Sequence, residues 1–134
     1  SKGWVTRAAL ARCLAALDAL PKGTAALVAV HHPLREAGTH GTALTRHGGA
    51  ALAELARRQV VGVLSGHVHD PFDIAEPTSA GAVRMIGAGT LSERIRSTPP
   101  SFNELVWDGA CLTVTVRNLE QVPTPAMLIR DVPE

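Results

Sequence analysis

The chain has 134 residues, of which 46% are hydrophobic and only 3% aromatic, and its formal net charge is +1. This length suffices for one compact domain whose core is built from alanine, valine, leucine and isoleucine. The 13 lysine and arginine residues are scattered, so the basic stripe typical of nucleic-acid-binding proteins is absent from the sequence, as is an apolar run of membrane-spanning length. We therefore expect a globular cytoplasmic protein with neither a nucleic-acid polymer nor a membrane as its partner.

The chain is expected to begin with a helix and a buried strand. Apolar residues recur at helical spacing from about Arg7 to Leu20, and Thr6 is a suitable N-cap. The next segment, Ala25–Val30, is a continuous apolar run without the alternation of a half-exposed strand. Such runs are typical of strands that are covered on both faces.

A second helix and a second buried strand are expected to follow. A polar loop from Leu34 to about Arg46 leads to leucines at helical spacing within Gly48–Arg58, and then to the apolar run Val60–Leu64. Two buried strands joined through a helix are typical of a parallel βαβ unit. Since the carboxyl ends of parallel strands meet at one edge of the sheet, the residues that follow the two runs are expected to converge there.

The second half of the chain predicts antiparallel hairpins, because short strand-like segments flank turns rich in proline, glycine and aspartate. The expected strand pairs are Phe72–Glu76 with Val83–Ile86, and Phe102–Trp107 with Ala110–Arg117. Together with the βαβ unit, these hairpins indicate an α/β (α+β) domain over residues 1–118. A proline-containing C-terminal arm over residues 119–134 completes the expected organisation.

The two cysteines, Cys13 and Cys111, each lie within an apolar pattern and form no Cys-x-x-Cys motif. We expect both to be reduced core residues rather than partners in a disulfide. Reduced cysteines agree with an intracellular location.

Four histidines follow the two buried runs. His31 and His32 come directly after the first run, and His67 and His69 come after the second, behind Gly66. His67 and His69 would point to the same side if the backbone stays extended. Imidazole nitrogens bind several transition metals, so the pattern favours a metal site, and histidines that act on a phosphate or as acid–base groups are the alternative.

The other polar candidates carry a weaker signal. His40 and His47 lie in or beside the polar loop, where we expect solvated side chains. Arg94 and Arg96 follow a strand in a loop and are candidates for bidentate binding of a substrate phosphate, although arginines in loops are usually solvated.

Four short segments share their motifs and order with a known family. They are Val30-His31-His32-Pro33-Leu34, Ser65-Gly66-His67-Val68-His69, Gly87-Ala88-Gly89-Thr90 and Thr98-Pro99-Pro100-Ser101-Phe102-Asn103. The set resembles the C-terminal half of the calcineurin-like metallophosphoesterases, with the bacterial class III cyclic-nucleotide phosphodiesterases as the nearest branch. The resemblance extends from about Gly3 to Asn118 and depends most on Gly-His-x-His combined with the upstream His-x-Pro.

This resemblance implies a fold and a reaction. The fold would be the C-terminal half of a four-layer αββα sandwich. The reaction would be phosphodiester hydrolysis by a metal-bound hydroxide at a centre of two divalent metal ions (Mn, Fe, Zn or Co), with a cyclic nucleotide such as 3',5'-cAMP as the expected substrate.

The resemblance also implies roles for the histidines. His31 and His67 resemble ligands of one metal, and His69 resembles a ligand of the other. His32 would then face the substrate or lie behind the ligands, as the catalytic candidate. The choice between His31 and His32 as the ligand stays open.

The chain lacks the family's Asp-x-His, Gly-Asp and Gly-Asn-His motifs, which supply the bridging carboxylate, the other ligands and the acid histidine. Three imidazoles without the bridging aspartate should hold a metal weakly, so we expect the chain alone to be inactive. Ser1 in place of an initiator methionine agrees with a fragment, whose partner would be the missing N-terminal half or a second copy of the chain. The alternatives are a non-catalytic metal-binding or interaction module that retains part of the fold, and a phosphate-binding domain without metal.

Overall fold

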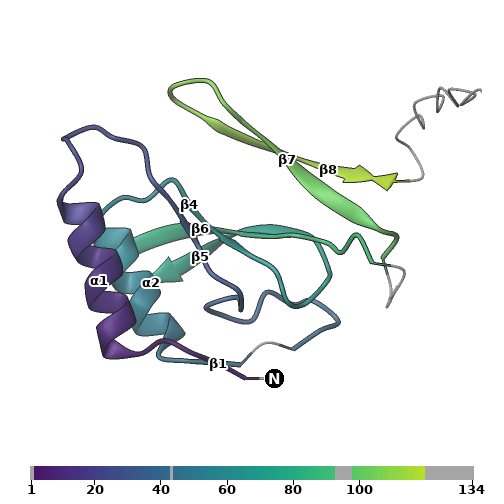
Figure 1. Ribbon diagram of the computed structural model, residues 1–134, viewed down its shortest axis with the longest axis horizontal. Helices are drawn as coiled ribbons and strands as arrows, with labels where there is room; N and C mark the ends of the chain where they lie inside the picture. The colour runs from purple at the N-terminus through teal and green to yellow at the C-terminus, as the bar shows by residue number, and fades with distance from the viewer. Residues whose placement is uncertain (1, 43, 93–97, 120–134) are drawn as a thin grey trace, which may run out of the picture.

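The computed structural model describes residues 2–42, 44–92 and 98–119 (Figure 1). Within these ranges the chain forms a central four-stranded sheet, two helices, a short parallel sheet of two strands and a separate antiparallel hairpin. Helices and strands of both orientations thus occur together, which confirms the predicted mixed α/β class at this coarse level.

The central sheet consists of β2 (Leu27–Ala29), β4 (Gly62–Ser65), β5 (Phe72–Thr78) and β6 (Gly81–Gly87). Their order across the sheet is β2-β4-β6-β5. β2 and β4 are parallel neighbours with Val28 opposite Val63, and β4 is also parallel to β6. β5 and β6 form an antiparallel pair. The predicted parallel pair and the first predicted hairpin are therefore confirmed.

The two apolar strands of the βαβ unit differ in burial. β4 has a strand on either side, and Gly62, Val63 and Ser65 are buried. β2 lies at the edge of the sheet, where Leu27 is 43% exposed. The prediction that Ala25–Val30 is covered on both faces is therefore wrong for the part of the chain that the structure describes, because Leu27 and Ala29 on one face of β2 are exposed and Val28 on the other face is only half-buried.

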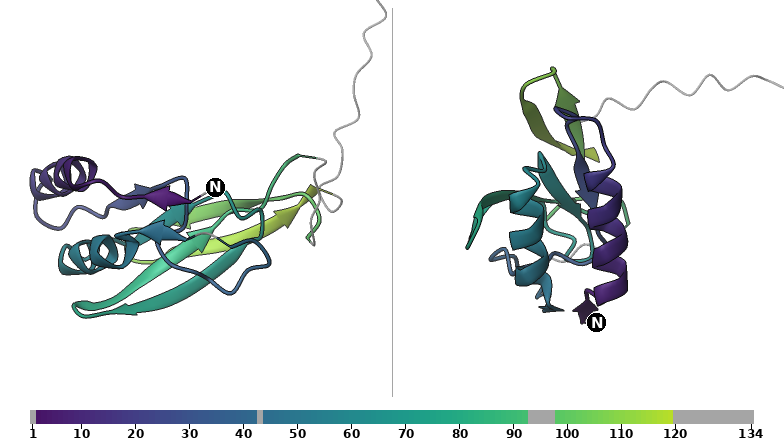
Figure 2. Two further views of the ribbon diagram at one scale, coloured as in Figure 1. Left: turned by 90° about the horizontal axis from the view of Figure 1, so that it is seen from below. Right: turned by 90° about the vertical axis from the view of Figure 1, so that its left-hand side faces the viewer.

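Two helices lie side by side next to the sheet (Figure 2). Helix α1 spans Arg7–Asp18, and the Thr6 hydroxyl accepts a hydrogen bond from the Ala9 backbone N–H at 3.1 Å, which confirms the predicted N-cap. Helix α2 spans Gly48–Arg57 and contacts β5 and β6. Neither of these described helices has the length and apolarity needed to cross a membrane.

The core lies between α2 and the sheet. Leu52 and Leu55 of α2 belong to the same buried cluster as Val63 of β4 and Met85 of β6. Helix α1 has no buried residue, so its apolar side chains are only partly covered. Among the described residues the buried core contains no aromatic side chain, as the composition predicts.

The segment expected to be a polar loop contains a short strand. β3 (Thr45–Arg46) pairs in parallel with β1 (Gly3–Trp4). The Thr45 hydroxyl donates a hydrogen bond to the Pro33 carbonyl oxygen at 2.7 Å, which ties this small sheet to the segment that follows β2. Two-residue strands are too short to carry a hydrophobic period, so the sequence pattern did not reveal them.

The second hairpin is formed by β7 (Ser101–Trp107) and β8 (Leu112–Asn118), as predicted. In Figure 1 it lies above the central sheet, with its turn at the upper left. Its large exposed apolar side chains are Phe102, Leu105, Val106, Trp107 and Val116. The predicted C-terminal arm, apart from Leu119, lies outside the described residues.

Both cysteines are free, but they differ in burial. Cys13 is half-buried on α1 and packs against the core. Cys111 is exposed in the turn before β8, so its prediction as a core residue is wrong. The side chains of a strand alternate between its faces, and here the neighbouring Leu112 is the one that is buried.

Candidate functional site

The candidate site lies where β2 and β4 end. Pairing between the two strands continues past their last residues, because the Val30 N–H donates to the Leu64 carbonyl oxygen at 2.9 Å and the Gly66 N–H donates to the His31 carbonyl oxygen at 3.1 Å. These two hydrogen bonds hold the segments that carry the histidines side by side. The predicted convergence of the two strand ends is therefore confirmed.

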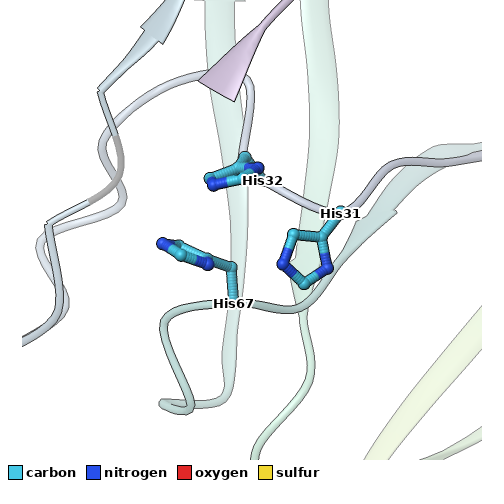
Figure 3. Close-up of side chains that lie close together, drawn as sticks. All are labelled: His31, His32 and His67. Carbon is cyan, nitrogen blue, oxygen red and sulfur yellow. The ribbon is translucent and has the colours of Figure 1, made fainter. Parts of the chain in front are cut away.

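Three imidazoles meet at this edge, and we call His31, His32 and His67 the histidine cluster (Figure 3). The ring centroids of His32 and His67 are 3.9 Å apart, those of His31 and His32 are 4.8 Å apart, and those of His31 and His67 are 5.2 Å apart. Each residue offers one nitrogen, and these three nitrogens all lie within 4.8 Å of one another. His31 is exposed, whereas His32 and His67 are half-buried, so an ion could reach the cluster from solvent.

The backbone after β4 turns sharply instead of staying extended. His67 and His69 both have positive φ values, 68° and 64°, and the Val68 N–H donates to the Gly66 carbonyl oxygen at 2.8 Å. The condition under which His67 and His69 would point the same way is therefore not met. Between the two histidines, Val68 is only 2% exposed, so the chain turns inward at this residue. Left-handed backbone at non-glycine residues is uncommon and often marks functional loops.

His69 lies outside the histidine cluster and is half-buried. Its Nδ1 atom is buried and has no hydrogen-bond partner among the described residues. The His69 carbonyl oxygen accepts a hydrogen bond from the Thr98 hydroxyl at 3.3 Å, which anchors the loop to the segment before β7. A buried polar atom without a partner is rare, and a bound ion or water is one common explanation.

Asp70 anchors the loop that carries His67 and His69, a role that the sequence interpretation missed. Its side chain is almost fully buried, and its carboxylate accepts hydrogen bonds from the His40 backbone N–H at 2.9 Å and from the Thr98 hydroxyl at 3.2 Å. Asp70 therefore fastens the loop that follows β4 to two distant segments. The signal in the sequence was an aspartate directly after Gly-His-x-His, but its partners are about 30 residues away and follow no spacing rule.

The two histidines of the polar loop stay apart from the cluster. The His40 side chain is 77% exposed, with Nδ1 at 3.6 Å from the Asp70 carboxylate. His47 is exposed at the start of α2 and has a φ value of 62°. The expectation of a solvated side chain is met by both residues, although His40 also contacts Asp70.

The environment of the cluster favours neutral imidazole at His67. Burial lowers the pKa of His67 below its ordinary value, and the positive charge that His32 carries when protonated lowers this pKa further. A neutral ring keeps a lone pair that a metal ion can bind. The neutral form of His67, which is the form able to bind a metal ion, therefore persists to lower pH than that of an isolated histidine.

The donor set of the cluster consists of imidazoles alone. Among the described residues no cysteine, aspartate or glutamate belongs to the group. Imidazole suits first-row ions such as zinc and iron, whereas manganese and magnesium prefer oxygen donors. Arg94 and Arg96, the candidates for binding a substrate phosphate, lie outside the described residues.

A cavity of about 370 Å³ adjoins the cluster. His31 and His32 line it together with apolar side chains of β2 and of both helices, such as Val28, Cys13 and Leu55. Its size is that of a small ligand pocket. The sequence interpretation did not predict this cavity, which results from the incomplete cover of β2 and α1.

The sequence matches no protein-family model, and none of the curated proteins with which it was compared matches it either. A functional assignment therefore depends on the geometry of the histidines and on the motifs quoted above.

Proposed function

We propose that this chain supplies a metal-binding histidine cluster to a phosphodiesterase of the calcineurin-like metallophosphoesterase type. One observation carries the proposal, namely that imidazoles from two distant segments meet at the carboxyl ends of adjacent parallel strands, with one nitrogen of each within 4.8 Å of the others. Rigid strand ends are suitable supports for metal ligands. The fold proposed is half of an αββα sandwich, which agrees with the exposed edge of β2 and the exposed hairpin β7–β8.

The residues present fit a divalent metal ion. His31 and His67 are proposed as ligands of one ion, and the neutral form favoured at His67 agrees with this role. The buried, unpartnered Nδ1 of His69 is proposed as a ligand of a second ion. Divalent cations held there would neutralise the charge of a phosphodiester and polarise its phosphorus–oxygen bonds.

His32 has two roles open to it within this proposal. Its ring lies closest to that of His67, so it can serve as a ligand in place of His31. In the other role it faces the substrate and transfers a proton to the leaving oxygen. Arg94 and Arg96 are proposed to bind the phosphate, and a cyclic nucleotide is the proposed substrate class.

The chain alone is proposed to bind metal weakly and to lack hydrolytic activity. The described residues bring no carboxylate into the histidine cluster, so a bridging oxygen ligand for two ions is absent from this donor set. Hydrolysis therefore requires ligands from another polypeptide segment. Added Mn²⁺ should not enable the purified chain to hydrolyse bis-p-nitrophenyl phosphate, and activity of the chain alone would contradict this part of the proposal.

A Co²⁺ titration, followed by calorimetry and visible absorption, tests the metal site. His67→Asn should weaken Co²⁺ binding by about tenfold or more, the scale on which metal sites respond to the loss of supporting groups. His47→Asn is the matched control, because His47 is exposed, lies outside the cluster and also has a positive φ value, which asparagine tolerates. Equal Co²⁺ affinity of the two variants would contradict the proposed site.

The exposed apolar side chains of β7 and β8 favour a second candidate, a non-catalytic interaction module. Leu105, Trp107 and Val116 share one face of this hairpin, and exposed apolar side chains that share a face often mark a protein interface. Elemental analysis distinguishes the two candidates, since the interaction module would contain no transition metal after purification or after incubation with Zn²⁺ or Co²⁺.

A further inference from the structure

Trp4 is a large aromatic side chain that belongs neither to the core nor to the histidine cluster. It lies on β1 and is 66% exposed, the highest value among the large hydrophobic residues in the described part of the chain. An indole buries much apolar area when a planar partner covers it. Trp4 therefore offers a contact surface that the described residues leave uncovered.

The indole is held by a neighbour although it is exposed. Trp4 pairs with Arg46 of β3, and the guanidinium carbon of Arg46 lies over the indole ring, 5.6 Å from its centroid. A guanidinium at this distance is attracted to the π-face of an aromatic ring. Because this contact restrains the ring, binding of a planar ligand would cost less side-chain entropy than at an unrestrained tryptophan.

Strand β1 packs directly against the histidine cluster. Gly3 is buried, and a Cβ atom in its place would lie 2.8 Å from the Cβ atom of His32, so a larger residue would clash. Consecutive Cα atoms lie about 3.8 Å apart. Trp4 is thus one residue away from the contact with His32.

Trp4 and two histidines of the cluster line the same cavity. Trp4, His31 and His32 all border the cavity of about 370 Å³. None of the described residues that line this cavity is a lysine, arginine, aspartate or glutamate, and most of them are aliphatic. A volume of this order suits a small organic ligand. The cavity thus combines an aromatic surface, uncharged walls and imidazole nitrogens.

These three features match the parts of a nucleotide. A nucleobase is planar and uncharged, and it stacks on aromatic side chains and on guanidinium planes. A phosphodiester is an anion, which a divalent ion held by imidazoles would bind. A purely apolar ligand would not use the imidazoles, and a phosphate without an organic group would not use the indole.

We propose that Trp4 stacks on the base of a nucleotide whose phosphodiester lies at the histidine cluster, and that Trp4 thereby selects cyclic nucleotides over phosphodiesters without a base. Binding of the phosphodiester rests on the proposed function. Stacking of the base stands on Trp4, its contact with Arg46 and the shared cavity. The two parts are therefore tested by separate probes.

Fluorescence of Trp4 reports the stacking directly. The chain has two tryptophans, and Trp107 lies outside the cavity, so Trp107→Leu makes Trp4 the only one that emits. The probes are adenosine, which has no phosphate, dimethyl phosphate, which is a phosphodiester without a base, and 3',5'-cAMP. Adenosine should quench Trp4 saturably without added metal, and 3',5'-cAMP should do so at lower concentration when Zn²⁺ is present. Dimethyl phosphate should not quench Trp4.

Variants of Trp4 test the same contact through affinity. Trp4→Leu keeps an apolar side chain without an aromatic face, and it should weaken binding of adenosine and 3',5'-cAMP by about tenfold in NMR titrations of the probes. Binding of dimethyl phosphate to the chain with Zn²⁺ should stay the same. Trp4→Phe should restore most of the lost affinity, because a phenyl ring also stacks on a base.

Trp107→Leu is the matched control, since it removes an exposed tryptophan outside the cavity and should bind all three probes like the parent chain. Circular dichroism checks that Trp4→Leu is folded. If it is not, the fluorescence titration decides the question, because it leaves Trp4 in place.

Three results would overturn the proposal. The first is adenosine that fails to quench Trp4, or that quenches it no more than dimethyl phosphate does. The second is equal affinity of Trp4→Leu and the parent chain for adenosine. The third is Trp4 emission that shifts with the concentration of the chain alone, which would identify a second copy as the partner of the indole. Failure of the proposed function is recognised separately, since Zn²⁺ would then tighten binding of neither dimethyl phosphate nor 3',5'-cAMP, while adenosine would still quench Trp4.

Discussion

β2 and β4 are built from the same kind of sequence but have different surroundings. Both derive from continuous apolar runs, yet β4 is buried between two strands while Leu27 of β2 is 43% exposed. The same contrast separates α2, which carries much of the core, from α1, which has no buried residue. An apolar run therefore indicates that a strand is suited to burial on both faces. The structure shows how much of that burial the described residues provide.

Replacing one leucine on each helix with alanine should give the largest difference in the free energy of unfolding, because α2 is buried against the sheet and α1 is only partly covered. Leu52 on α2 is fully buried, so Leu52→Ala should lower the free energy of unfolding by about 3 kcal/mol through lost burial and the remaining cavity. Leu17→Ala on α1 should cost about 1 kcal/mol, because Leu17 is only partly buried and the loss of burial is correspondingly small. Urea denaturation of both variants measures the difference, and equal losses would show that α1 is covered as well as α2.

The matched pair of valines on the two strands should differ in the same direction by a smaller amount. Val63 of β4 is 2% exposed and lies opposite Val28 of β2, which is half-buried. Val63→Ala should cost about 2 kcal/mol and Val28→Ala about 1 kcal/mol, in proportion to the apolar area that each removes. A greater loss for Val28→Ala in urea denaturation would contradict the assignment of β2 as the less covered strand.

The smallest change in the free energy of unfolding is expected when the pH is varied. The pKa of His67 is lowered in the folded state, mainly by burial. In the unfolded state the imidazole has a pKa of about 6.5. Between these two values the unfolded state binds more protons, so the free energy of unfolding should fall as pH decreases through this window and recover as pH rises. Urea midpoints between about pH 7 and pH 5 measure this slope around the reference value.

His67→Asn provides the control for this pH dependence, because asparagine does not titrate and tolerates the positive φ value of this position. The variant should show a smaller slope than the parent chain over the same pH range. The lowered pKa of Asp73, which its hydrogen bond with Arg84 causes, acts below the ordinary value of 3.8 and so outside this window. An unchanged slope in His67→Asn would contradict the burial of this imidazole.

The sequence was sufficient to predict the framework that carries the candidate site. Helices α1 and α2, the parallel pair β2 and β4, and both hairpins follow from hydrophobic periods and turn residues that act over short distances. The meeting of His31 with His67 also followed, because parallel strands joined through a helix end at the same edge.

The remaining features of the fold and of the candidate site depended on contacts between segments that are distant in the sequence. The inward turn at Val68 separates His67 from His69, and it results from burial that no local pattern records. The hydrogen bonds of Asp70 to His40 and Thr98 join segments about 30 residues away on either side. The exposure of β2 could not be predicted from its own residues, since its apolar run is typical of a strand that is buried on both faces.

Anomalous scattering from crystals of the chain grown with Co²⁺ tests the central claim most directly. The account predicts a peak within coordination distance of the imidazole nitrogens of His31 or His32 and of His67, about 2.1 Å from each bound nitrogen. A peak confined to His40 or His47, or no peak at saturating Co²⁺ with the rings of His31 and His67 turned apart, would contradict it.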